Sequence, residues 1–74
     1  MAAKIRIKGH VPRNELIETQ KKTKDARLYR NIEIVLFAYD GLSATKIANR
    51  INCSPATVCG WIRSWNEQGL DGLT

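Results

Sequence analysis

The hydrophobic positions of the chain fall into blocks with helical spacing, separated by short polar stretches. Val58, Trp61, Ile62 and Trp65 recur at i, i+3, i+4 and i+7, a spacing that places all four on one face of a helix. The longest block has the widest apolar stripe, so we expect it to be the central helix of the core. The pattern predicts an all-α fold with helices at residues 12–22, 25–40, 44–51 and 55–68.

The matching apolar stripes of these helices predict how the core is built. We expect Trp61 to be buried with Ile47, Val58 and Val35, because these residues lie on the apolar faces of three successive helices. In a chain of 74 residues, the two tryptophans of the last predicted helix can supply a large share of a small core.

Two of the predicted helices are joined by a tight turn within the stretch Ser43–Gln68. Ser43 and Ser54 are good N-cap residues, and Pro55 suits the first helical position, where an N–H group is not needed. Asn52 tolerates the left-handed backbone that a sharp turn between helices requires. This spacing predicts a helix-turn-helix, whose second helix enters the major groove of DNA with its N-terminal residues on the base edges.

The polar face of this second helix supplies the candidate contacts. It carries small or polar side chains and one cation, Arg63, whose planar guanidinium suits either a guanine edge or a phosphate. Both roles for Arg63 stay open. The predicted DNA-binding residues are Ser54, Ala56, Thr57, Gly60, Arg63 and Ser64, with Thr45, Lys46 and Arg50 on the preceding helix and Lys4, Arg6 and Lys8 near the N-terminus.

Charge is distributed unevenly along the chain. The net charge is +5, yet residues 1–30 hold nine lysines and arginines against three acidic residues, and the remainder is slightly acidic. A basic front half favours a polyanionic partner. Residues 1–10 alternate basic and apolar side chains, which predicts a flexible basic arm. Two interpretations of this arm stay open, a disordered terminus or a segment that follows a phosphate backbone or enters a minor groove.

Other chemistry finds little support in the sequence. Cys53 and Cys59 do not suggest a disulfide, and with His10 they do not make a zinc site. No nucleophile has a base in reach, and no apolar run is long enough to span a membrane. We therefore expect a cytoplasmic, nucleoid-associated protein that binds double-stranded DNA and is not an enzyme. We expect no metal, no cofactor, no small-molecule substrate and no membrane partner.

The chain divides into three parts on these patterns. Residues 1–10 are the basic arm, residues 11–69 are the helix-turn-helix domain, and residues 70–74 are a tail or a linker to a further domain.

Several short motifs carry a resemblance to a known family. They are Gly41-Leu42-Ser43, Ile47-Ala48, Ser54-Pro55, Thr57-Val58, Trp61-Ile62 and Gly69-Leu70-Asp71-Gly72-Leu73. With them the chain resembles the homeodomain-like N-terminal DNA-binding domain of bacterial insertion-sequence transposases related to the mariner class. The resemblance implies binding to the terminal inverted repeats of the element. It also implies that cleavage belongs to a separate catalytic domain, and it allows a homodimer in the full-length protein.

The resemblance also assigns roles to individual residues. Thr57 would contact a phosphate or base edge, Ala56 and Arg63 would face the groove, and Trp61 would belong to the core. The chain departs from the family at Gly60, where a basic or polar residue is common, and at Pro55, which removes a side chain that could contact a base. A stand-alone transcriptional regulator, a remnant reading frame and a helical protein-interaction module are the alternatives.

Overall fold

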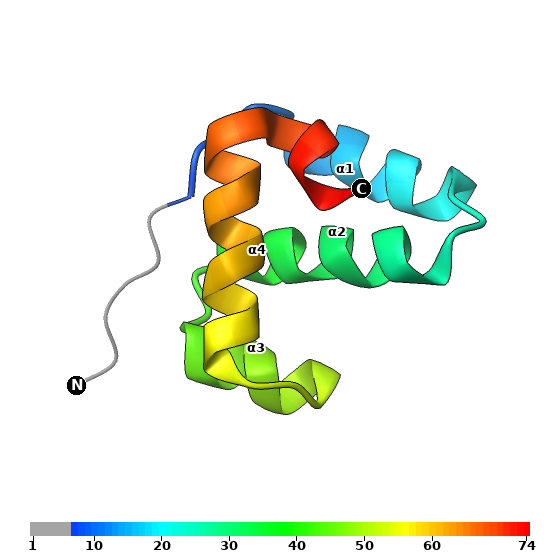
Figure 1. Cartoon of the computed structure of the whole chain (residues 1–74). Coiled ribbons are helices and arrows are strands. Elements are labelled where there is room, and N and C mark those ends of the chain that lie inside the picture. The colour runs from blue at the N-terminus through cyan, green and yellow to red at the C-terminus, as the bar shows by residue number, and fades with distance from the viewer. Residues whose placement is uncertain (1–6) are drawn as a thin grey trace.

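Four α-helices and a short 3-10 helix make up the computed structural model, which describes residues 7–74. The elements are α1 (Arg13–Lys22), α2 (Ala26–Tyr39), α3 (Ala44–Ile51), α4 (Pro55–Gln68) and η1 (Gly69–Leu73). In Figure 1, α1 and α2 run antiparallel and α4 crosses α2. The helix α3 lies near the start of α4. Each helix lies within one residue of its predicted bounds, and residues 7–74 contain no strand, so the all-α prediction is confirmed.

Polar side chains cap α2, α3 and α4 as their sequence positions suggest. The Asp25 carboxylate accepts from the backbone N–H of Arg27 at 2.9 Å, and the Ser43 and Ser54 hydroxyls accept N–H groups in the first turns of α3 and α4. Asn52 adopts the left-handed conformation, with φ 59° and ψ 53°. These caps fix where α3 ends and α4 begins, so the predicted helix-turn-helix is confirmed.

The core consists of two adjoining clusters that share α2. The first joins α1, α2, α4 and η1, and its buried members are Leu16, Ile32, Val35, Leu36, Trp65 and Leu73. The second joins α2, α3 and α4 through Ile34, Ala38, Ile47, Ala48, Val58 and Ile62. Because α2 contributes to both clusters, it is the central helix, as its wide apolar stripe predicted.

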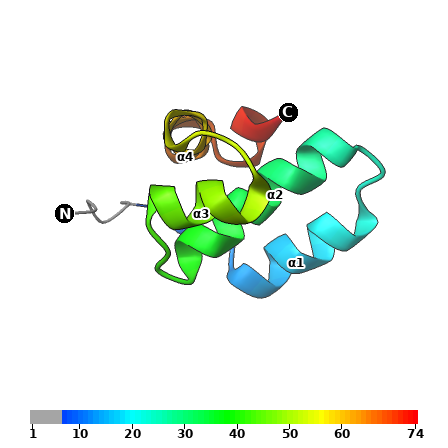
Figure 2. The same ribbon diagram turned by 90° about the horizontal axis from the view of Figure 1, so that it is seen from below.

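The C-terminal residues are part of the core, which corrects their prediction as a tail or linker. Gly69, at φ 65°, turns the chain back along α4, and Leu73 is only 1% exposed. The buried Asn31 side chain donates from Nδ2 to the Leu73 carbonyl at 2.9 Å. Gly72 packs so closely on the Ser64 carbonyl that a Cβ would clash with it. Figure 2 shows η1 lying beside α4. The apolar Leu73 finds its partners within the domain.

The segment before α1 is also packed, in contrast to the flexible arm that the alternating pattern predicts for residues 1–10. The Trp65 indole Nε1–H donates to the Lys8 carbonyl at 2.7 Å, and the Lys8 N–H donates to Asn66 Oδ1 at 2.8 Å. The Tyr39 hydroxyl donates to the Val11 carbonyl at 2.8 Å. A buried indole N–H needs an acceptor, and this segment supplies it. Lys4 and Arg6, the other arm cations, lie outside the described residues.

Candidate nucleic-acid interface

The exposed side of α4 is a stripe of small side chains that ends in a cation. Ala56, Gly60 and Arg63 follow one another at i, i+4 and i+7, and all three are exposed. The opposite side of the same helix is buried in both core clusters. Side chains this small let another molecule approach the helix backbone closely, while the Arg63 guanidinium reaches beyond them. We call this stripe the outward face of α4.

Two hydroxyls lie together at the start of α4. The Ser54 and Thr57 hydroxyl oxygens are 2.9 Å apart, and the Ser54 oxygen also accepts the Thr57 backbone N–H at 3.2 Å. The cap therefore orients both side chains, which are exposed. Hydroxyl groups held at a helix N-terminus are suited to bind phosphate oxygens, because the helix dipole is positive there.

Trp61 is the main correction to the predicted core. It packs against both clusters but is only half-buried, whereas Trp65, one turn later, is fully buried. In Figure 1 α4 crosses α2, so the two helices diverge on either side of the crossing. One side of the Trp61 indole therefore faces a hollow between the two helices.

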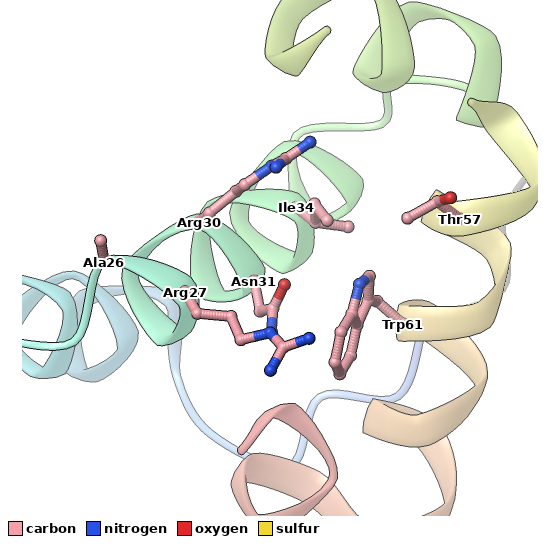
Figure 3. A pocket seen from close by; sticks show the side chains of 7 residues that line it. All are labelled: Ala26, Arg27, Arg30, Asn31, Ile34, Thr57 and Trp61. Carbon is pink, nitrogen blue, oxygen red and sulfur yellow. The ribbon is translucent and has the colours of Figure 1, made fainter. Parts of the chain in front are cut away.

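Figure 3 shows this hollow, which sequence reasoning did not include in the site. It encloses about 610 Å³ and is lined by Ala26, Arg27, Arg30, Asn31, Ile34, Thr57 and Trp61. The Arg27 side chain extends from α2 toward Trp61 (Figure 3). In the sequence, Arg27 and Arg30 contribute only to the charge of the basic front half. Ile34 follows Arg27 by seven positions and Arg30 by four. This helical spacing places the three residues on one face of α2, and it is the signal in the sequence that could have included the arginines in the site.

A shallower depression of about 300 Å³ continues the hollow onto α4. Thr57, Gly60, Trp61 and Ser64 line it, so it shares Thr57 and Trp61 with the hollow. Two predicted site residues, Gly60 and Ser64, therefore line a depression that adjoins the hollow with the α2 arginines.

The predicted residues of α3 lie on a separate helix. Thr45, Lys46 and Arg50 are all exposed, but the Arg50 guanidinium lies 5.6 Å from the centre of the Phe37 ring. A cation–π contact of this kind holds Arg50 toward α2 without removing its charge. The Lys8 side chain is exposed on the flank of α4 that carries Asn66.

Ion pairs within residues 7–74 leave the basic groups of the interface unneutralised. Arg13 pairs with Asp40 at 2.9 Å and Lys21 with Glu18 at 3.8 Å, and neither pair includes Arg27, Arg30 or Arg63. Cys53 and Cys59 are free thiols, as expected.

No cluster of three or more His, Cys, Asp or Glu side chains with metal-binding geometry occurs in residues 7–74. None of the helices there is long and apolar enough to cross a membrane.

Comparison with known proteins gives one match. The family model for a homeodomain-like domain matches residues 25–74, from the cap of α2 through η1. No curated protein and no solved structure matches the chain significantly.

Proposed function

The chain belongs to the homeodomain-like family, and we propose that it binds double-stranded DNA sequence-specifically by placing the outward face of α4 in the major groove. A homeodomain-like helix-turn-helix indicates DNA binding in itself. The observation that carries the groove assignment is the contrast between the two sides of α4. One side is buried in the core. The other side exposes Ala56, Gly60 and Arg63 to solvent, and Arg63 takes part in neither ion pair found in residues 7–74.

The outward face has a direction along α4. Thr57 lies in the first turn and Arg63 two turns from the start, while Glu67 adds a carboxylate one turn later. A carboxylate is repelled by phosphates, so the first two turns of α4 are the part we place deepest in the groove. Major grooves are about 12 Å wide and admit a helix of this size.

The biological role we propose is the DNA-binding part of a transposase that recognises terminal inverted repeats. Its support is the set of short motifs that resembles the insertion-sequence transposases, together with the homeodomain-like match. In this role the module contributes binding and not cleavage, and it acts in the cytoplasm at the nucleoid. Incubation of the pure chain with duplex DNA and Mg²⁺ or Mn²⁺ should leave the DNA intact.

The test begins with the parent chain and a fluorescent duplex in a titration of KCl concentration. Binding should weaken steeply as salt rises, because neutralised phosphates release counterions. Selection from a random duplex pool should then enrich a preferred sequence. A chain that binds no duplex at low salt would overturn the proposal and favour a protein-interaction module.

Arg63 separates base contact from phosphate contact through two substitutions. Arg63→Lys keeps the charge but loses the planar fork that pairs with guanine O6 and N7. If Arg63 contacts a base, both Arg63→Lys and Arg63→Ala should relax preference at one position, at about 1–3 kcal/mol of discrimination. If Arg63 holds a phosphate, Arg63→Lys should bind like the parent and Arg63→Ala should lower the salt slope by about 1. Lys21→Ala, on the far helix α1, is the control for lost charge.

A further inference from the structure

Resting on the proposed function, we infer that the hollow between α2 and α4 is a binding site for the DNA backbone, in which Arg27 and Arg30 hold phosphate oxygens beside the recognition helix. The seven side chains that line the hollow include these two arginines and no acidic residue. Asp25, the N-cap of α2, directs its carboxylate to the start of that helix, where it accepts from two backbone N–H groups. An anion would therefore meet a cationic surface there.

The two arginines are held in different ways. Arg30 Nη2 donates to the Ile51 carbonyl at 3.4 Å, a long bond that directs this side chain toward the end of α3. Arg27 extends toward Trp61 across the hollow (Figure 3) and takes part in neither ion pair found in residues 7–74. Arginine suits phosphate because its planar fork can donate two parallel hydrogen bonds.

The hollow is continuous with the surface proposed to meet DNA. The depression lined by Thr57, Gly60, Trp61 and Ser64 joins the hollow to the outward face of α4. A duplex that receives this face in its major groove therefore brings one groove wall over the mouth of the hollow. The Thr57 hydroxyl, oriented by Ser54, lies between the bases and that wall.

The other flank of α4 completes the geometry. There the segment with Lys8 is fixed by hydrogen bonds to Asn66 and Trp65. Along α4, Thr57 and Asn66 lie on opposite sides of the stripe that ends in Arg63, because successive residues of a helix are about 100° apart. The helix thus has a cationic group on each side, one for each phosphate wall of a groove. Specificity stays with the outward face, and the hollow fixes how the helix is seated in the groove.

The experiment compares Arg27→Ala/Arg30→Ala with Lys21→Ala/Lys22→Ala, a pair that removes the same charge from exposed positions on α1. Binding of each to a 20-bp mixed-sequence duplex is measured over a range of KCl concentration. A plot of log K against log[KCl] has a negative slope. For the arginine variant the magnitude of this slope should decrease by about 1 if the two arginines share a phosphate, and by about 2 if each holds its own. The α1 variant should keep the parental slope, and thermal unfolding should show that both variants are folded.

Trp61 gives an independent readout within the hollow. Duplex binding should shield the Trp61 indole from acrylamide quenching in the parent, and Trp61→Phe should remove the shielded component of the fluorescence. If the parent binds DNA but the two double variants show the same change in salt dependence, or no change, the hollow is not a phosphate site. Unchanged acrylamide quenching on binding leads to the same conclusion. Either result leaves DNA binding by α4 intact, whereas failure of the parent to bind overturns the proposed function itself.

Discussion

Two tryptophans one turn apart on α4 lie in opposite surroundings. Trp65 is fully buried, its N–H is bonded to the Lys8 carbonyl, and the rings of His10 and Tyr39 lie edge-on at 5.5 Å and 6.3 Å. Trp61 is half-buried beside an open hollow with two arginines. Both belong to one apolar stripe, so the difference comes from the chain segments that cover them.

The segments that cover Trp65 are residues 7–11 and η1. The N-terminal segment and η1 close over the region of Trp65, and no comparable segment of residues 7–74 covers the outer edge of Trp61. The part of α4 around Trp65 is therefore covered and stabilises the domain. The part from its start to Trp61 keeps an accessible surface, where DNA is proposed to bind. Each of the following experiments tests one side of this difference.

Trp65→Ala should have the largest effect. Removing a fully buried indole costs about 3–5 kcal/mol, which is close to the whole stability of so small a domain. Trp61→Ala should cost no more than about 2 kcal/mol, because its side chain is only half removed from water. Urea unfolding measures both, and Trp65→Phe supplies a folded comparison if Trp65→Ala does not fold. Equal losses for the two alanine variants would contradict the contrast.

Leu73→Ala should have the next largest effect. Its side chain is 1% exposed in the first core cluster, and we expect a loss of about 2 kcal/mol, the lower end for a buried leucine because the chain end can relax. Leu70→Ala, only half-buried in the same 3-10 helix, is the matched control and should cost less. A Leu73→Ala variant with the parental urea midpoint would show that η1 does not stabilise the domain.

Tyr39→Phe should have a smaller effect that depends on pH. Burial raises the pKa of the Tyr39 phenol above its ordinary value of 10.0, because it disfavours the charged phenolate. The folded protein thus prefers the neutral phenol. Its contribution to stability is complete below pH 10 and is lost as pH rises above 10 through the raised pKa.

The measurement is the free energy of unfolding at pH 8 and at pH values above 10. Tyr39→Phe should cost about 1 kcal/mol at pH 8 through the lost hydrogen bond, and the difference from the parent should shrink as pH rises. Tyr29→Phe, at an exposed position, is the control and should change neither value. A difference between Tyr39→Phe and the parent that stays constant up to high pH would mean that the phenol does not titrate differently on folding.

The sequence predicted the helices closely because their signals are local. Caps such as Ser54 and the left-handed Asn52 act within a few residues, and apolar stripes fix which side of each helix is buried. The outward face of α4 followed from the same stripe. The exposure of Ala56, Gly60 and Arg63 agrees with that expectation, although their contact with DNA stays a prediction.

Features that depend on distant segments were not predictable in this way. The burial of Leu73 depends on a turn at Gly69. The packing of residues 7–10 depends on hydrogen bonds between the Lys8 backbone and side chains on α4. The half-exposure of Trp61 depends on how α2 crosses α4. The same crossing places Arg27 and Thr57, which are 30 positions apart, in the lining of one hollow, so no local pattern connects them.

The central claim is that the outward face of α4 meets DNA while the opposite side stays in the core, and an NMR titration tests it most directly. The ¹⁵N-labelled chain is titrated with a mixed-sequence duplex at low salt, and each backbone amide is followed. The account predicts the largest shifts at the start and outward face of α4, from Ala56 to Arg63, with smaller shifts at Arg27 and Arg30. Amides of residues 15–22 on α1 should stay in place. Shifts confined to α1, or none at a DNA concentration that saturates binding, would contradict the account.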